Sequence, residues 1–173
     1  MINHKKTLIL LCGILFLFFT SCEKSVMAPD SPSEGILVGY EGCKTHSQSS
    51  GSETGLIPSS KECLEYEYDQ NFILHLKHIN AGFNCCPKKI YADIDISGNM
   101  ITIEEKEQEE GCFCLCLFDV KYQILNLKPG EYTVKITGPC LEERDPAAEF
   151  TLKLLFPCSG IYCIDRTHYP WGQ

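Results

Sequence analysis

The chain has 173 residues, and 23 acidic residues against 15 lysines and arginines give it a formal charge of −8 at pH 7. Because nucleic-acid phosphates require clustered basic side chains, this acidic chain is not expected to bind nucleic acid. The same balance argues against a polybasic contact with anionic lipid headgroups. The 12 cysteines are many for this length, and their use depends on the compartment in which the chain folds.

Residues 1–21 have the pattern of an export signal. Lys5 and Lys6 precede an apolar run over residues 8–19, which is shorter than the roughly 20 residues of a membrane-spanning helix but typical of a signal peptide. The run ends in "FTSC", which resembles the lipobox of bacterial lipoproteins. By this resemblance the chain is cleaved before Cys22, which is diacylated on sulfur and acylated, for example with palmitate, on its new amino group. The alternative is an ordinary secretory signal with an incidental cysteine.

Residues 22–60 are predicted to form a flexible tether behind the lipidated cysteine. They are dominated by Ser, Gly, Pro, Glu and Thr, and such a composition offers too few apolar groups to offset the entropy of ordering. A short apolar patch at residues 36–38 interrupts the tether. Cys43 also interrupts it and could pin this segment to the domain that follows.

From about Lys61, short runs alternate apolar and polar side chains, separated by turn signals such as "NAG", "SGN" and "KPG". About seven or eight such strands in roughly 100 residues predict an all-β fold, a single β-sandwich over residues 61–163. A small closed barrel is the alternative. The positions expected to face inward are Leu64, Tyr66, Tyr68, Phe72, Leu74, Leu76, Ile90, Ala92, Ile94, Ile96, Ile101, Ile103, Tyr132, Val134, Ile136, Phe150, Leu152, Leu154 and Phe156.

Ten cysteines remain once Cys12 is removed with the signal and Cys22 is lipidated, since 12 − 2 = 10. The exported side of a bacterial envelope is oxidising, so these cysteines predict a sandwich stapled by up to five disulfides. Their pairing cannot be read from the sequence alone. The ten candidates are Cys43, Cys63, Cys85, Cys86, Cys112, Cys114, Cys116, Cys140, Cys158 and Cys163.

Three of these cysteines, Cys112, Cys114 and Cys116, stand two residues apart in a run that continues into a strand pattern. Side chains alternate faces along a strand, so these three are expected to share the apolar face of Phe118 and Val120. Residues i and i+2 of a strand are about 6.6–6.8 Å apart with parallel side chains, so the three are not expected to bond to one another. The suggested partners are Cys85 and Cys86 for two of them and Cys63 or Cys140 for the third, with a local Cys158–Cys163 loop.

The same thiols could instead bind a soft metal ion such as copper(I) or zinc. Structural zinc sites usually present cysteines as C-x-x-C on turns, and C-x-C on a straight strand suits a tetrahedron less well. The sequence therefore favours disulfides and predicts no metal and no cofactor.

Two other clusters of metal-ligating residue types are given structural interpretations. His75 and His78 fall on opposite faces of a strand and cannot hold one ion together, so one packed and one exposed histidine are expected. The acidic run at residues 104–110 lacks the spacing of a calcium loop and is expected to be a solvated hairpin tip.

The C-terminal tail over residues 164–173, with the tyrosine just before it, concentrates aromatic and basic side chains of the kind that dominate protein interfaces. The alternative is a flap that covers the sandwich. No Ser/His/Asp arrangement, phosphate loop or nucleotide fingerprint is present, so no enzymatic activity is expected. The candidate binding surface consists of Tyr162, Arg166, His168, Tyr169 and Trp171.

The segments Asn84–Pro87, Cys112–Asp119 and Ile124–Tyr132 together resemble a group of small lipoproteins from Bacteroides-type bacteria. That group carries an N-C-C-P segment, a C-x-C-x-C-[FY]-D strand and an I-x-[NG]-L-x-x-G-x-Y hairpin, and here Leu117 is inserted before Phe118. The resemblance spans about residues 72–137. It implies an immunoglobulin-like sandwich on an envelope lipoprotein, and it implies no particular activity.

The sequence thus predicts an outer-membrane lipoprotein that is held to the membrane through Cys22, on either the periplasmic or the surface side. Its expected role is non-catalytic binding or structure, with an envelope protein or a glycan as partner. A metal-binding lipoprotein with clustered thiolates is the alternative. An inhibitor of a protease or glycosidase would also fit a small stapled sandwich, but no motif supports it.

Overall fold

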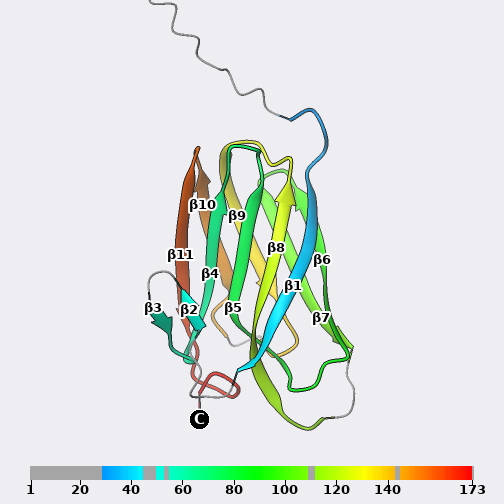
Figure 1. Ribbon diagram of the computed structural model, residues 1–173, viewed down its shortest axis with the longest axis vertical. Coiled ribbons are helices and arrows are strands. Elements are labelled where there is room, and N and C mark those ends of the chain that lie inside the picture. Colours follow the sequence, from blue (N-terminus) through cyan, green and yellow to red (C-terminus); the bar gives the residue numbers. More distant parts are fainter. Residues whose placement is uncertain (1–28, 45–49, 53–54, 109–111, 143–144, 173) are drawn as a thin grey trace, which may run out of the picture.

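The computed structural model describes residues 29–44, 50–52, 55–108, 112–142 and 145–172 (Figure 1). These residues form two β-sheets packed face to face and a small separate hairpin, with no helix among them. No described helix is therefore long and apolar enough to cross a membrane. Residues 1–28, which hold the expected signal peptide and Cys22, lie outside the described residues.

The first sheet has five antiparallel strands in the order β1-β8-β5-β4-β11, and the second has four in the order β10-β9-β7-β6. In the second sheet, β7 and β9 run parallel. The first sheet comprises β1 (Glu34–Lys44), β8 (Leu115–Leu125), β5 (Leu74–Asn84), β4 (Lys61–Tyr68) and β11 (Cys158–Asp165). The second comprises β10 (Ala148–Leu154), β9 (Gly130–Thr137), β7 (Met100–Gln108) and β6 (Lys89–Ser97), and the hairpin pairs β2 (Ser50–Ser52) with β3 (Gly55–Ile57).

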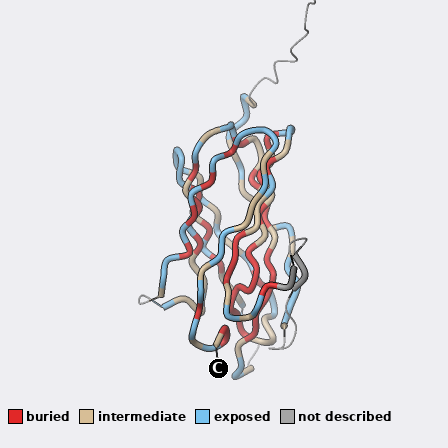
Figure 2. Tube along the Cα trace, turned by 90° about the vertical axis from the view of Figure 1, so that its left-hand side faces the viewer, coloured by how far each residue is buried: buried red, intermediate tan, exposed pale blue. Residues whose placement is uncertain are grey.

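The core lies between the two sheets, where the buried positions line the inner side of each layer (Figure 2). The alternating runs supply it, as the sequence predicts, and the β-sandwich is confirmed. The two sheets remain separate, so the barrel alternative is wrong. One inward prediction fails: Phe156 lies beyond the end of β10 and is 36% exposed, although its ring packs 4.8 Å from that of Tyr68.

The predicted tether over residues 22–60 contains an edge strand of the sandwich. β1 pairs with β8 from Glu34 to Lys44, so the folded unit begins well before residue 61. The glycines of β1, which suggested flexibility, lie where the strand packs closely against its neighbours. A Cβ at Gly35 would lie 2.3 Å from Ile94, and one at Gly42 would lie 2.5 Å from the Phe118 ring. Glycine here lets the strand approach its neighbours, which composition alone does not reveal.

The predicted C-terminal tail is also part of the fold. β11 continues to Asp165, and Arg166 and Trp171 are each only 2% exposed. Trp171 packs over Gly82, where a Cβ would lie 2.9 Å from the indole ring, and its Nε1 donates a 2.6 Å hydrogen bond to the Asn80 carbonyl oxygen. The tail is therefore a flap that completes the sandwich.

The acidic run predicted as a solvated hairpin tip is strand over most of its length. β7 extends to Gln108, and Glu105 on it is 4% exposed. The side chain of Glu107 accepts a 2.8 Å hydrogen bond from the backbone nitrogen of Asn84. Residues 109–110 lie outside the described residues.

Candidate functional site

Eight of the candidate cysteines form four disulfides in the described part of the chain. These bonds are Cys43–Cys116, Cys63–Cys163, Cys85–Cys114 and Cys86–Cys112. Three of the four gather where β1 and β5 end and the antiparallel β8 begins. The fourth joins β4 to β11, whose register places its two cysteines directly opposite each other.

The pairing differs in part from the suggestions of the sequence. Cys85 and Cys86 bond to two of the three closely spaced cysteines, as suggested. The third, Cys116, bonds to Cys43 and not to Cys63 or Cys140. The suggested local Cys158–Cys163 bond is absent, and Cys140 and Cys158 are free thiols. The sequence did not predict that β1 belongs to the sheet, so it gave no reason to place Cys43 near Cys116 of β8.

The expectation that Cys112, Cys114 and Cys116 share the core face is also wrong. β8 begins at Leu115, so only Cys116 lies on the strand, and only Cys116 is buried. Cys114 is exposed and Cys112 is half-buried. The first two cysteines are in the connection before the strand, where the alternation of faces does not apply.

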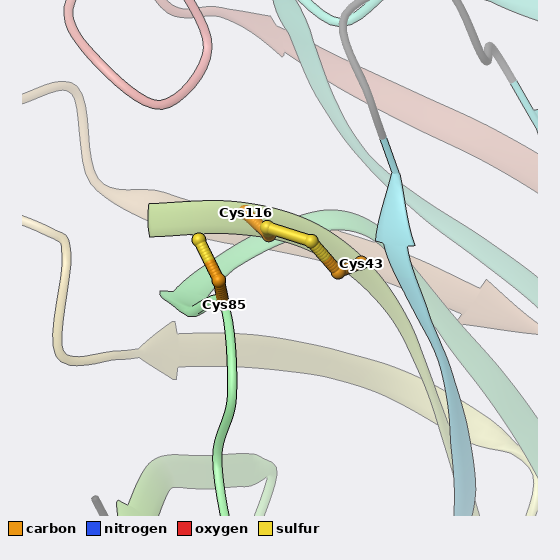
Figure 3. A group of neighbouring side chains, drawn as sticks. All are labelled: Cys43, Cys85 and Cys116. Atoms are coloured by element: carbon orange, nitrogen blue, oxygen red, sulfur yellow. A yellow bond between two sulfur atoms is a disulfide. The ribbon is translucent and has the colours of Figure 1, made fainter. Parts of the chain in front are cut away.

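Three sulfur atoms from two of these disulfides lie close together. The Sγ atoms of Cys43, Cys85 and Cys116 are all within 4.8 Å of one another (Figure 3). In the structure, Cys43 is bonded to Cys116 and Cys85 to Cys114, and a metal needs deprotonated thiolates and not disulfide sulfurs. The group could hold a soft metal ion only after reduction.

A second cluster, the buried charge chain, crosses the core between the two sheets. His78 of β5 is at its centre: Nε2 lies 2.7 Å from Glu62 Oε1 on β4, and Nδ1 lies 2.7 Å from Glu105 Oε1 on β7. Arg166 Nε donates to Glu62 Oε2 at 2.5 Å, and the Tyr122 hydroxyl donates to Glu105 Oε1 at 2.5 Å. All five side chains are buried.

The charges of the buried charge chain alternate in sign, and each charge stabilises its neighbours. Burial disfavours the imidazolium, but Glu105 and Glu62 outweigh burial and raise the pKa of His78 to about 10. Burial would raise the pKa of Glu62, but His78 and Arg166 lower it. Burial and Glu105 together raise the pKa of Tyr122, which therefore stays protonated and donates its hydrogen bond. The charge chain is closed to solvent and joins the two sheets, which suits a structural role.

Most of the buried charge chain was not predicted from the sequence, although the alternating patterns contain a signal for it. His78 was expected to be the packed or the exposed member of a pair, and the structure buries it while His75 remains partly exposed. Glu62 continues the inward positions of β4, and Glu105 continues those of β7 beyond Ile103. Extending each alternating pattern through its charged residues would have placed these groups in the core together.

The residues expected to form a binding surface are not all exposed. Arg166 and Trp171 are buried, whereas Tyr162 and Tyr169 are exposed. The Tyr169 hydroxyl is engaged with the backbone of Leu115, at 2.9 Å from its nitrogen and 2.8 Å from its oxygen. His168 lies 3.3 Å from the Asp145 carboxylate and is only partly exposed.

A groove of about 790 Å³ lies instead across the five-stranded sheet. Residues of all five strands line it, so it follows the outer side of the sheet, away from the core. Its wall carries both signs of charge: Glu65 on β4 lies directly across from Lys77 on β5, and Glu67 on β4 and Lys121 on β8 also line it. Val38 on β1 adds an apolar edge that is 54% exposed.

Comparisons with known proteins assign no role to these features. The chain matches no protein-family model, no curated protein and no solved structure.

The disulfide pattern predicts two alkylatable thiols in the described part of the chain when the protein is denatured without reductant. In the native protein, Cys158 should react first, because burial raises the pKa of the Cys140 thiol to about 12 and leaves little thiolate. Peptide mapping by mass spectrometry identifies both thiols and the four bonds. Additional free thiols that disappear when copper(I) or zinc is added would contradict the pattern and indicate a metal site.

The charge chain predicts a pH dependence of stability in which His78 is the titrating group. The folded pKa is raised above the ordinary 6.5, so the stabilisation is fully present below about pH 6.5 and is lost as the pH rises through about 10. Between pH 7 and 8.5, the free energy of unfolding should fall by up to about 1.4 kcal/mol per pH unit. Denaturant titrations at several pH values measure this slope.

The matched variants for this test are His78→Gln and His75→Gln. The first should lose the slope and be destabilised by about 3–5 kcal/mol, because it leaves buried carboxylates poorly paired. The second removes a partly exposed histidine and should keep the slope. If His78→Gln does not fold, NMR of the wild-type imidazole decides, and a His78 that titrates near pH 6.5 would contradict the assignment.

Proposed function

We propose that this protein is a lipid-anchored protein of the outer membrane whose sandwich has a non-catalytic binding or structural role. The observation that carries the proposal is the set of four disulfides, since such bonds persist in oxidising compartments and indicate an extracellular or envelope location. The lipobox-like sequence before Cys22 supports anchoring. Two or three acyl chains on one residue would hold it stably in a bilayer.

The early start of β1 determines how far the sandwich can stand from the membrane. Glu34 follows Cys22 by only 34 − 22 = 12 positions along the chain. Fully extended, such a segment spans at most about 40 Å. The sandwich is therefore held close to the lipid surface, much closer than a tether over residues 22–60 would allow.

The groove on the five-stranded sheet is the surface on which we place partner binding. Charged groups of both signs beside an apolar edge suit a polar protein segment or a glycan that makes ion pairs and hydrogen bonds. The chain enters β1 at one end of the sandwich and the sheet runs from there to the opposite end (Figure 1). A partner in the groove would cross all five strands of the anchored layer.

Metal binding by thiolates is the second candidate function. The closeness of the Cys43, Cys85 and Cys116 sulfurs favours it, because reduction would give three soft ligands within 4.8 Å of one another. The disulfides of the described structure favour the first proposal.

Replacing Cys22 with Ser should release the protein from the membrane fraction, because no acyl chain can then be attached. Fractionation of cells that express the full chain, followed by immunoblotting, measures this. The matched control is Cys158→Ser, which removes a free thiol of the sandwich and should leave the protein in the membrane fraction. A Cys22→Ser protein that still sediments with membranes would contradict the lipid anchor.

A photo-crosslinking residue at Val38 should capture the partner in intact cells, because this position lies at the edge of the groove and is exposed. The control position is Tyr91 of β6, which is 39% exposed on the other sheet. Adducts are detected by electrophoresis and identified by mass spectrometry. Adducts from Tyr91 but not from Val38 would contradict the groove as the binding surface.

A further inference from the structure

Lys44, Asn80 and Asp119 meet where β1, β8 and β5 lie side by side. Lys44 Nζ contacts Asp119 Oδ1 and lies 3.0 Å from Asn80 Oδ1. The backbone nitrogen of Asn80 donates to Asp119 Oδ1 at 3.2 Å. Asn80 is 1% exposed and Asp119 2% exposed, and the Lys44 side chain is only 11% exposed. The amine thus contacts both the carboxamide and the carboxylate, and all three groups are shielded from water.

The carboxamide of Asn80 is held in one orientation. Asn80 lies at a bulge of β5 and has a φ of 62°. Its Nδ2 donates to the carbonyl oxygens of Pro58, at 3.0 Å, and Lys61, at 2.7 Å. Because both N–H groups are occupied by acceptors, the oxygen Oδ1 faces Lys44. The amide carbon, one bond beyond Oδ1, is therefore within reach of the amine after a small side-chain rotation.

The charges around this group suit a nucleophilic lysine and a carboxylate base. Burial lowers the pKa of Lys44, only partly opposed by Asp119, and so favours release of a proton from its ammonium. Burial would raise the pKa of Asp119, but hydrogen bonds and charge from Lys44 and Lys77 lower it. Lys77 Nζ lies 3.1 Å from Asp119 Oδ2. The lowered pKa keeps the Asp119 carboxylate ionised, so it is a poor target for attack and holds a proton from Lys44 only transiently, whereas the neutral amide of Asn80 is the better electrophile.

We propose that Lys44 and Asn80 form an intramolecular isopeptide bond, with Asp119 as the proton carrier. Asp119 takes a proton from the ammonium, and the neutral Nζ attacks Cγ of Asn80. The Nζ–Cγ bond forms and the Cγ–Nδ2 bond breaks. The departing nitrogen keeps its two hydrogens and receives the two protons that Nζ gives up, one of them through Asp119. It leaves as ammonium, Asp119 is ionised again, and no oxidant or other reactant is needed.

The bond would join the end of β1 to β5 across β8, beside the Cys43–Cys116 disulfide. Unlike that disulfide, it would survive reduction. It therefore fixes the anchored edge strand in the sheet under conditions that open the disulfides. Neither the lipid anchor nor the groove takes part in this bond, because all three groups lie within the sandwich.

Peptide mapping of the full-length wild-type protein tests the bond directly. After complete reduction and alkylation, trypsin should fail to cut after Lys44, and a branched peptide should join Lys44 to Asn80. Its mass should be the sum of the two linear peptides less one ammonia. Linear peptides with an unmodified Lys44 and Asn80 overturn the proposal. Loss of one water, with fragments that join Lys44 to Asp119, overturns the choice of Asn80.

Variants separate the roles of the three groups. Lys44→Met should give only linear peptides, and Asp119→Asn should keep amine and amide but lose most of the cross-link. Lys153→Met, on β10 of the other sheet, is the control and should be cross-linked as fully as the wild type. A fully cross-linked Asp119→Asn protein would show that the carboxylate does not carry the proton. If that variant does not fold, the wild-type map still decides whether the bond exists.

Discussion

The pairing of His78 with two carboxylates in the core is the interaction on which the packing of the two sheets depends. Apolar contacts between sheets tolerate small shifts, because one methyl group replaces another at little cost. Buried charges do not, since each must keep its partner or lose several kcal/mol of stabilisation. His78 and Glu62 lie on one sheet and Glu105 on the other, with imidazole-to-carboxylate distances of 2.7 Å. These three groups select one relative placement of the layers from those that apolar contacts would allow.

The same cluster explains why the last residues of the chain belong to the fold. Arg166 supplies the positive charge that Glu62 needs beside His78, and its Nη1 donates to the carbonyl oxygen of Pro146 at 2.7 Å. The Arg166 guanidinium lies 5.7 Å from the Trp171 ring, which in turn covers Gly82. Residues after β11 thus exclude water from the charge chain. The segment after β11 is held in place by its contacts with the buried charge chain and not by pairing in a sheet.

The sequence predicted the class of fold well, because alternation of apolar side chains is a direct consequence of a half-buried strand. It also predicted the disulfides, because the expected export signal implies an oxidising compartment in which such bonds persist. The prediction failed at residues whose type suggests a surface or linker position but which lie in packed parts of the fold. Gly35 and Gly42 resemble flexible linker glycines but permit close packing, and Glu105 resembles a surface charge but continues an inward series. Such cases are decided by what lies opposite in space, and local composition does not carry that information.

The position of β1 connects the proposed anchor to the covalent bonds of the sandwich. The chain enters β1 at one end of the sheet and leaves it at the opposite end, where Cys43 is bonded to Cys116 (Figure 1). A pull on the N-terminus acts along the strand, while the far end of the strand is held by the disulfide. The β1–β8 hydrogen bonds are then loaded together in shear, and they do not open one after another from a free end. The proposed lipid anchor would load this edge strand first, and three of the four disulfides lie at its far end, where they would resist the pull.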